Sequence, residues 1–287
     1  MAQDIWQGTT SNWGTVGNWS LGAAPVSTND VLFPATNSQD IDTSITTQDA
    51  IAVATMLIQS GCLINIGGSG NQLEIHATKV VHMGSGSVWY KSAQSAGGNT
   101  DLIVVNSPRL YGTSGDPAMD LDDDGTSLIN RLVVLRGYTR VAAAATGTIA
   151  KVEVCGIQAY LSTLAGAGTF TTFTQTSGLS NLNNNVTTLE AFGGICTYAA
   201  GTIGSKIVVG AGARLIYNST TTLPHVKVLP GGFVDFSKDL RSKTVTLLEV
   251  LPGGGWDEGP GNVTFTTKSL PNDNGSASLG FGGGGGV

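Results

Sequence analysis

The fold of this chain is decided by the stretch from Leu189 to Glu258, which repeats one pattern four times. The copies read Leu189-Glu-Ala-Phe-Gly-Gly-Ile-Cys-Thr-Tyr198, Val208-Val-Gly-Ala-Gly-Ala-Arg-Leu-Ile-Tyr217, Lys227-Val-Leu-Pro-Gly-Gly-Phe-Val-Asp-Phe236 and Glu249-Val-Leu-Pro-Gly-Gly-Gly-Trp-Asp-Glu258, at offsets of 19, 19 and 22 residues. Each copy is a short apolar strand, a glycine turn and a second strand. A strand–glycine–strand unit that recurs about every 20 residues predicts a solenoid whose stacked coils bury one continuous core.

The same alternation continues towards the N-terminus. Met56–Ile58, Leu102–Val105 and Leu132–Leu135 are apolar runs bounded by glycine, asparagine or proline, as short strands are. Spacings of 19 to 25 residues leave room for three short faces in each coil. We therefore predict an all-β fold, a right-handed parallel β-helix of about ten rungs over residues 41–268. Residues 1–40 are predicted to form an N-terminal capping segment, and the glycine-rich residues 269–287 a flexible tail.

Composition narrows the classes of partner. Only 12% of the 287 residues are charged, and the net charge is −6, so the chain lacks the clustered lysine and arginine that nucleic acids and anionic membranes require. No apolar run approaches the roughly 20 residues of a membrane helix, and the first residues lack signal-peptide features. We expect synthesis in a reducing cytoplasm, with Cys62, Cys155 and Cys196 serving as small buried hydrophobic residues rather than redox or metal groups.

Three tryptophans stand in the first segment at spacings that no helix would place on one face. Trp6, Trp13 and Trp19 are separated by glycine, asparagine and serine turns. The first rung of a solenoid exposes strand edges and apolar surface, so these rings are predicted to cap it or to contact a partner there.

The pattern Trp13-Gly, Gly17-Asn18-Trp19-Ser20, Gly22, Pro25 and Asp30-Val31 resembles the opening segment of β-solenoid passenger and adhesin-type proteins. It is also similar to the openings of β-helical virion proteins from tailed bacteriophages. The resemblance covers about a tenth of the chain. It implies the β-helix fold and does not imply an enzymatic activity.

An acidic run is the strongest candidate for a metal site. Asp120, Asp122 and Asp124 lie in an Asp-x-Asp-x-Asp-Gly pattern, within a polar stretch from Gly112 to Asp124 that we predict to be a loop interrupting the ladder. Such a pattern places carboxylates around a tight turn as calcium loops do, but Arg131 stands where the bidentate glutamate is expected. Calcium binding and a solvated turn between rungs both remain open.

Two acids suggest glycan cleavage as an alternative. Asp235 and Asp257 fall at equivalent positions of the last two copies, so stacking would place them one strand spacing apart, within reach of a paired-carboxylate mechanism. The alternative is that both are solvent-facing strand ends. His76, His82 and His225 are too scattered for a metal signature and are expected to be structural or exposed.

The aromatic residues that end the copies also have two interpretations. Tyr198 and Tyr217, continued by Phe236, form either an interior stack, which we favour, or an exposed face on which sugars pack.

Three classes of function remain. The first is a non-enzymatic virion structural protein of a bacteriophage, a capsid decoration or cement protein that self-associates, as a trimer, and contacts the major capsid protein or other virion proteins. Low charge, unpaired cysteines, the tryptophan-rich opening and the glycine tail favour it. The second is a tailspike or adhesin-type carbohydrate-binding β-helix with a cell-surface glycan as partner. The third is a polysaccharide-cleaving enzyme. We expect location in the virion and no cofactor, with Ca²⁺ the alternative.

Overall fold

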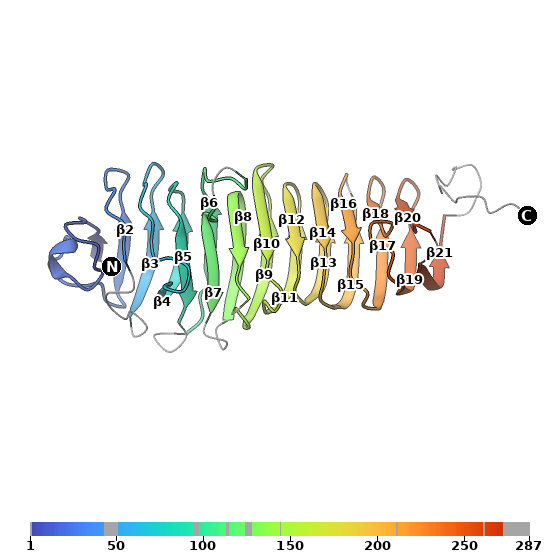
Figure 1. Cartoon of the computed structure of the whole chain (residues 1–287), viewed down its shortest axis with the longest axis horizontal. Helices are drawn as coiled ribbons and strands as arrows, with labels where there is room; N and C mark the ends of the chain where they lie inside the picture. The colour runs from blue at the N-terminus through green and yellow to red at the C-terminus, as the bar shows by residue number, and fades with distance from the viewer. Residues whose placement is uncertain are drawn as a thin grey trace, which may run out of the picture.

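A computed structural model of the chain describes residues 2–42, 51–93, 98–112, 115–123, 128–143, 145–210, 212–260 and 262–271. Figure 1 shows a straight rod of stacked coils that runs from the N-terminus at one end towards the C-terminus at the other. The part of residues 269–287 predicted to be a flexible tail lies outside the described residues from 272 onwards.

One side of the rod is a parallel ladder, here called the long ladder. In the described residues it contains thirteen strands: β1 Ala2–Ile5, β2 Asn29–Phe33, β3 Ala52–Ile58, β4 Leu73–His82, β6 Leu102–Asn106, β8 Leu128–Val141, β9 Thr148–Val154, β11 Thr169–Gln175, β13 Val186–Ala191, β15 Ile203–Val209, β17 Leu223–Val228, β19 Lys243–Val250 and β21 Val263–Ser269. The ladder begins with β1 and β2, inside the segment 1–40.

A second parallel ladder, here called the short ladder, forms the adjoining side. It includes the first residues of β4 and the last residues of β8, and its other members are β5 Val88–Ser92, β7 Met119–Asp123, β10 Ala159–Thr163, β12 Leu179–Leu182, β14 Ile195–Tyr198, β16 Arg214–Tyr217, β18 Phe233–Asp235 and β20 Gly255–Asp257. From β4 onwards each coil therefore gives one strand to each ladder, and turns close the third side. The earlier coils reach the short ladder only through the isolated bridges Ile41–Ile66 and Ile66–Val88. The prediction of an all-β parallel β-helix is confirmed, with about ten turns.

Glycine corners join the two ladders. β8 passes from the long ladder to the short one at Gly137, whose φ of 96° is in the left-handed region. A Cβ on Gly137 would also lie 2.8 Å from the carbonyl oxygen of Ser107 in the preceding coil. Close stacking of the coils and a left-handed corner together select glycine at this position.

The register of the four copies agrees with the sequence alignment except in one strand. Thr197, Ile216, Asp235 and Asp257 are successive neighbours in the short ladder, as the alignment predicts. In the long ladder, however, Val208 neighbours Glu190 instead of Leu189. The corner between β13 and β14 has one residue fewer than the corner between β15 and β16, and this difference shifts the earlier strand by one position.

The interior is mostly apolar, with aromatic side chains stacked from coil to coil in its C-terminal half. Tyr198, Tyr217 and Phe236 are fully buried, with the two tyrosine rings stacked at 5.5 Å and 3° and the phenylalanine 6.0 Å further on. The interpretation of this column as an interior stack is confirmed. Burial also raises the pKa of Tyr198, whose hydroxyl donates to the Asn184 carbonyl at 2.8 Å.

The three tryptophans close the first coil. The segment that carries them is the dark blue loop at the N-terminal end of the rod in Figure 1. Trp6, Trp13 and Trp19 are buried and pack with ring centroids 4.8 to 5.0 Å apart, over Phe33 of β2. Asn18, in the short 3-10 turn Val16–Asn18, fixes the loop by bonding to threonine and asparagine groups around it. The rings therefore cover the core and are not available to a partner.

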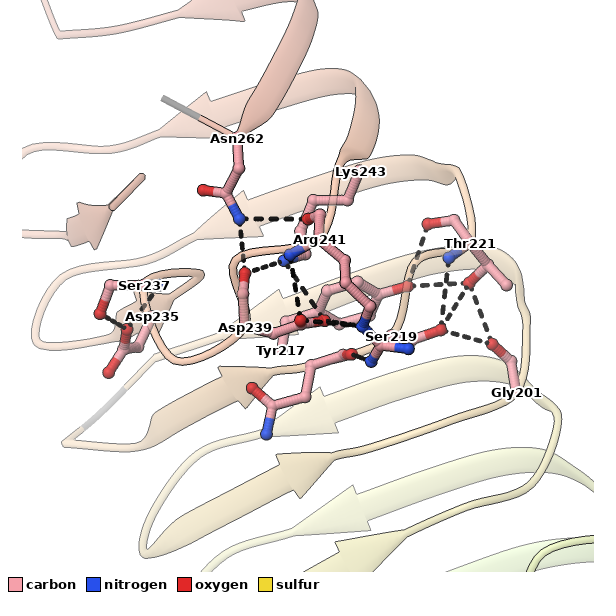
Figure 2. Close-up of polar contacts among 11 residues, drawn as sticks. Gly201, Tyr217, Ser219, Thr221, Asp235, Ser237, Asp239, Arg241, Lys243 and Asn262 are labelled. Carbon is pink, nitrogen blue, oxygen red and sulfur yellow. Dashed lines mark hydrogen bonds and ion pairs between the residues drawn. The ribbon is translucent and has the colours of Figure 1, made fainter. Parts of the chain in front are cut away.

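Polar side chains close the third side of the last coils, as Figure 2 shows. Lys243 has a fully buried side chain whose Nζ donates to the Asp239 carbonyl at 2.6 Å. Arg241 pairs with the Asp239 carboxylate at 2.9 Å, which lowers the pKa of Asp239 to about 2. The Asn262 amide donates to the carbonyls of Asp239 and Arg241, linking one coil to the next. On this third side, side-chain hydrogen bonds hold neighbouring coils together where the two ladders use strand pairing.

Candidate functional site

The outer surface of the short ladder carries a continuous column of large side chains, here called the outer column. Alternate residues of a strand point to opposite faces, and because Leu161 and Leu182 are buried in the core, Tyr160 and Leu179 face outwards. Successive rungs place these outward residues side by side, in the order Tyr138, Tyr160, Leu179, Ile195, Arg214 and Phe233. Leu179 is 45% and Ile195 40% exposed.

Three tyrosines gather at the N-terminal end of this column, here called the tyrosine cluster. Tyr111, from the loop after β6, is 59% exposed and packs on Tyr160 with ring centroids 4.2 Å apart and on Tyr138 at 5.1 Å. Tyr138 and Tyr160 are direct neighbours in the ladder, at 5.3 Å. Burial, with the neighbouring tyrosines, raises the pKa of Tyr160, so its hydroxyl stays protonated.

A second column of outward side chains runs beside the first and is polar. Arg140, Ser162, Asn181 and Thr197 are neighbours in four successive rungs and are here called the polar column. The Ser162 hydroxyl lies 3.2 Å from the Tyr138 hydroxyl, which joins the two columns. The Asn181 Oδ1 atom accepts no hydrogen bond from any described residue.

Arg140 is held in place from two sides. Its guanidinium lies over the Trp89 ring, 5.2 Å from the centroid, and its Nε and Nη2 both donate to Oδ2 of Asp120. The pairing raises the pKa of Arg140, while burial raises the pKa of Asp120 despite the arginine. The charges on this part of the surface are therefore paired internally.

The long ladder has a different outward column over its N-terminal half, here called the aliphatic column. Its members are adjacent in five successive rungs and alternate along their strands with core residues: Leu32, Leu57, Val81, Val104 and Val133. Leu32 and Val133 are buried, and the other three are half-buried. At the next rung the column changes to Glu153, which pairs with Arg131 and Lys151. One half of this face is apolar and the other half polar.

The described residues of the calcium candidate lie in a strand and not in the predicted loop, while calcium binding itself stays a prediction. Met119–Asp123 is strand β7 of the short ladder, and Asp120, Asp122 and Asp123 are buried. Asp120 pairs with Arg140, and Asp123 accepts the Gly147 N–H at 3.0 Å. The alternative prediction, a solvated turn between rungs, is wrong for Asp120 and Asp122, because both lie in this buried strand. Asp124 lies outside the described residues, in which no group of three or more potential metal ligands occurs.

The two acids proposed for glycan cleavage are neighbours in the short ladder, as expected. Asp235 is buried, so it is not a solvent-facing strand end. It pairs with Arg214 at 2.5 Å and accepts bonds from Ser237; these contacts outweigh burial and lower its pKa. Asp257 accepts the Gly259 N–H at 2.9 Å. Each carboxylate accepts a hydrogen bond from the backbone N–H two residues later in the chain, Asp235 from Ser237 and Asp257 from Gly259. Both aspartates therefore stabilise the turns that follow their strands.

The histidines are far apart in the described structure, as predicted. His76 contacts the Asn99 carbonyl, His225 contacts Glu249, and His82 is fully buried without a hydrogen-bond partner. Among the cysteines, Cys62 and Cys196 are buried as expected, but Cys155 is exposed at the corner after β9.

Sequence reasoning missed the tyrosine cluster, although a signal was present. Tyr138, Leu179 and Ile195 each follow a glycine at positive φ, Gly137, Gly178 or Gly194. In these three coils the residue after the corner glycine is a member of the outer column. Aligning the sequence on its corner glycines would therefore have placed these three side chains at equivalent positions.

Comparisons with protein-family models, with curated proteins and with solved structures found no match for this chain. Among the described residues, no helix has the length and apolar character needed to cross a bilayer.

Proposed function

We propose that this chain is a non-enzymatic structural protein of a bacteriophage virion, a capsid decoration or cement protein that self-associates on the particle. The observation that carries the proposal is the aliphatic column on the long ladder, from Leu32 to Val133. Apolar side chains aligned on the outer face of a rigid sheet are typical of surfaces that another protein covers.

Self-association follows from the shape of this surface. The column is straight, because its members are adjacent rungs of a parallel ladder, and five rungs extend over roughly 20 Å at the strand spacing. Three rods arranged around one axis would bring the three columns together and remove them from water. A closed ring of three identical contacts is a symmetric solution that leaves no apolar face exposed.

A structural role also agrees with the state of the acids. Asp120 and Asp235 are each engaged by an arginine, and so neither is a free proton donor or acceptor. The resemblance of the opening segment to β-helical virion proteins supports the same class. The proposal requires no cofactor, and adding a chelator is expected to leave the melting temperature unchanged.

The oligomeric state tests the aliphatic column directly. Light scattering coupled to size exclusion is expected to give a trimer for the native chain and a monomer for the double variant Val81→Lys, Val104→Lys. Thr174→Lys is the matched control, because Thr174 occupies the same outward column in its polar half, next to Glu153 and Glu190. A native monomer, or a double variant that remains trimeric, contradicts the proposal.

The location is tested on the particle. Gold-labelled antibodies against the purified rod, applied to phage particles from the producing culture, are expected to label the capsid at many symmetry-related positions. Labelling confined to the tail would move the protein to a tail-associated role, and particles without label would overturn the virion assignment.

A further inference from the structure

We propose that the tyrosine cluster and the polar column of the short ladder form a binding site for an uncharged oligosaccharide. This inference goes beyond the structural role, and it concerns a different side of the rod from the aliphatic column. It would give a decorated particle a means of adhering to a glycan-coated surface.

Aromatic surface is the first requirement of such a site. The negative face of an aromatic ring attracts the weakly positive C–H bonds on the face of a sugar ring. Tyr111 presents the most exposed of the three rings, at 59%, and Tyr138 and Tyr160 support it from below at 5.1 and 4.2 Å. Leu179 and Ile195 continue the apolar column beyond the rings, so the site can accommodate more than one sugar.

Hydrogen-bonding groups beside the rings are the second requirement, because a sugar has hydroxyls around its edge. Ser162, Asn181 and Thr197 supply hydroxyl and amide groups one strand spacing apart, parallel to the outer column. The Tyr160 hydroxyl lies among these groups, hydrogen-bonded to Tyr111 and Asn181.

Charge on this face selects against other partners. Arg140 is neutralised by Asp120, and Arg214 by Asp235, so these two arginines are not available to a nucleic acid or to an acidic peptide. A sugar presents an apolar ring face and hydroxyls at its edge, and so matches a surface on which aromatic and polar side chains lie side by side. The uncharged oligosaccharide is the occupant that fits.

Rigidity makes the site effective. Tyr138, Tyr160, Ser162 and Asn181 stand on strands that are paired on both sides, so their backbone is already ordered before a ligand arrives. Binding then loses little conformational entropy, and shallow contacts can give measurable affinity.

The test uses the full chain, fluorescently labelled, on a glycan array carrying neutral oligosaccharides, with sulfated and sialylated glycans as charge controls. Binding to neutral glycans is expected. For the best-bound glycan, Tyr111→Ala and Tyr160→Ala are expected to weaken affinity roughly tenfold to a hundredfold, as truncation of an aromatic anchor does. Tyr160→Phe is expected to retain more affinity than Tyr160→Ala, because it keeps the ring. Ile157→Ala is the control, since Ile157 is 88% exposed at a nearby corner outside both columns.

Absence of binding to any neutral glycan overturns the proposal, as does equal affinity of the native chain and the two tyrosine-to-alanine variants. If those variants instead dissociate the oligomer, the occupant is a second copy and the glycan site is wrong. The Val81→Lys, Val104→Lys variant separates the two proposals, because it is expected to lose the oligomer while each monomer still binds the glycan.

Discussion

His82 lies in the core at the end of β4, between Ile58 and Val105 of the adjacent coils. Its side chain is fully buried, and neither ring nitrogen has a hydrogen-bond partner, although backbone groups of Gly86 and Ala118 are close. Burial, assisted by the charge of Arg109, lowers the pKa of His82 from 6.5 to about 4. The imidazole is therefore neutral in the folded chain at pH 7.

This histidine is expected to make stability depend on pH in a defined window. Because the pKa is lower in the folded state, the unfolded chain binds the proton first as the pH falls. The contribution of His82 is complete above pH 6.5 and is lost between pH 6.5 and 4, by about 3 kcal/mol in total. Urea unfolding of His82→Leu should lack this part of the slope, and His225→Gln should retain it. Identical slopes in the native chain and His82→Leu would contradict the assignment.

The Asp120–Arg140 pair makes a second residue-scale prediction. Asp120 is buried, so removing its partner in Arg140→Met leaves an uncompensated carboxylate and is expected to cost about 3 kcal/mol. Arg131→Met breaks the more exposed pair with Glu153 and should cost at most about 1 kcal/mol. Chemical denaturation of the two variants measures the difference, and equal costs would show that burial does not govern the Asp120 pair.

At the scale of the elements, the corners between the ladders are the most constrained parts of the chain. Gly178 and Gly212 both have positive φ, 77° and 84°, but their surroundings differ. A Cβ on Gly178 would lie 2.5 Å from the carbonyl oxygens of Gly156 and Ala159, whereas a Cβ on Gly212 would meet open space.

The two corners separate backbone strain from steric conflict. Gly212→Ala is expected to cost about 1 kcal/mol, the usual penalty of a left-handed conformation, and Gly178→Ala at least about 2 kcal/mol, because the coils must also move apart. Thermal and urea unfolding of both variants provide the comparison. A Gly178→Ala cost no larger than that of Gly212→Ala would mean that the coils separate easily.

The tryptophan cap is the element that terminates the apolar interior. Deleting residues 2–22 removes β1 and the rings over Phe33, so the edge of β2 and the first core layer meet water. We expect aggregation of the deleted chain, measured by light scattering of freshly purified protein. Unchanged solubility would show that the cap is dispensable. Val16→Ala, at an exposed position in the same loop, is the control and is expected to remain soluble through the same purification.

The whole molecule is a stack in which each coil contacts mainly its neighbours, so stability should vary along the rod. Central coils have partners above and below, while among the described strands β21 pairs with β19 alone and has mostly exposed residues. Amide hydrogen exchange is expected to be slowest from β9 to β17 and fastest in β21. Uniform protection over the described strands would instead indicate a single cooperative unit.

The rod also keeps its two proposed binding surfaces apart. The aliphatic column belongs to the long ladder and the tyrosine cluster to the short one, and these ladders form different sides of each coil. An oligomer built on the first side would leave the second facing solvent. Whole-molecule geometry therefore allows attachment and adhesion by one chain.

The sequence by itself determined the fold class, the coil length, the tryptophan cap and the interior aromatic column. These depend on local signals, because strand periodicity and glycine corners recur within about 20 residues wherever a coil is built. The register of Asp235 and Asp257 followed from the same repeat.

Only the tertiary structure decided which side chains become neighbours. A corner that is one residue shorter shifts a strand by one position, and such a shift exchanges inward and outward residues. Tyr138 and Tyr160 are 22 residues apart and form one surface only when their coils are stacked in register. Asp120 to Asp123 resembled a loop because aspartate is rare in strands, but contacts with Arg140 and Gly147 from later in the chain stabilise a strand there. Interactions between coils, rather than local preference, determine which side chains lie together on the surface of this protein.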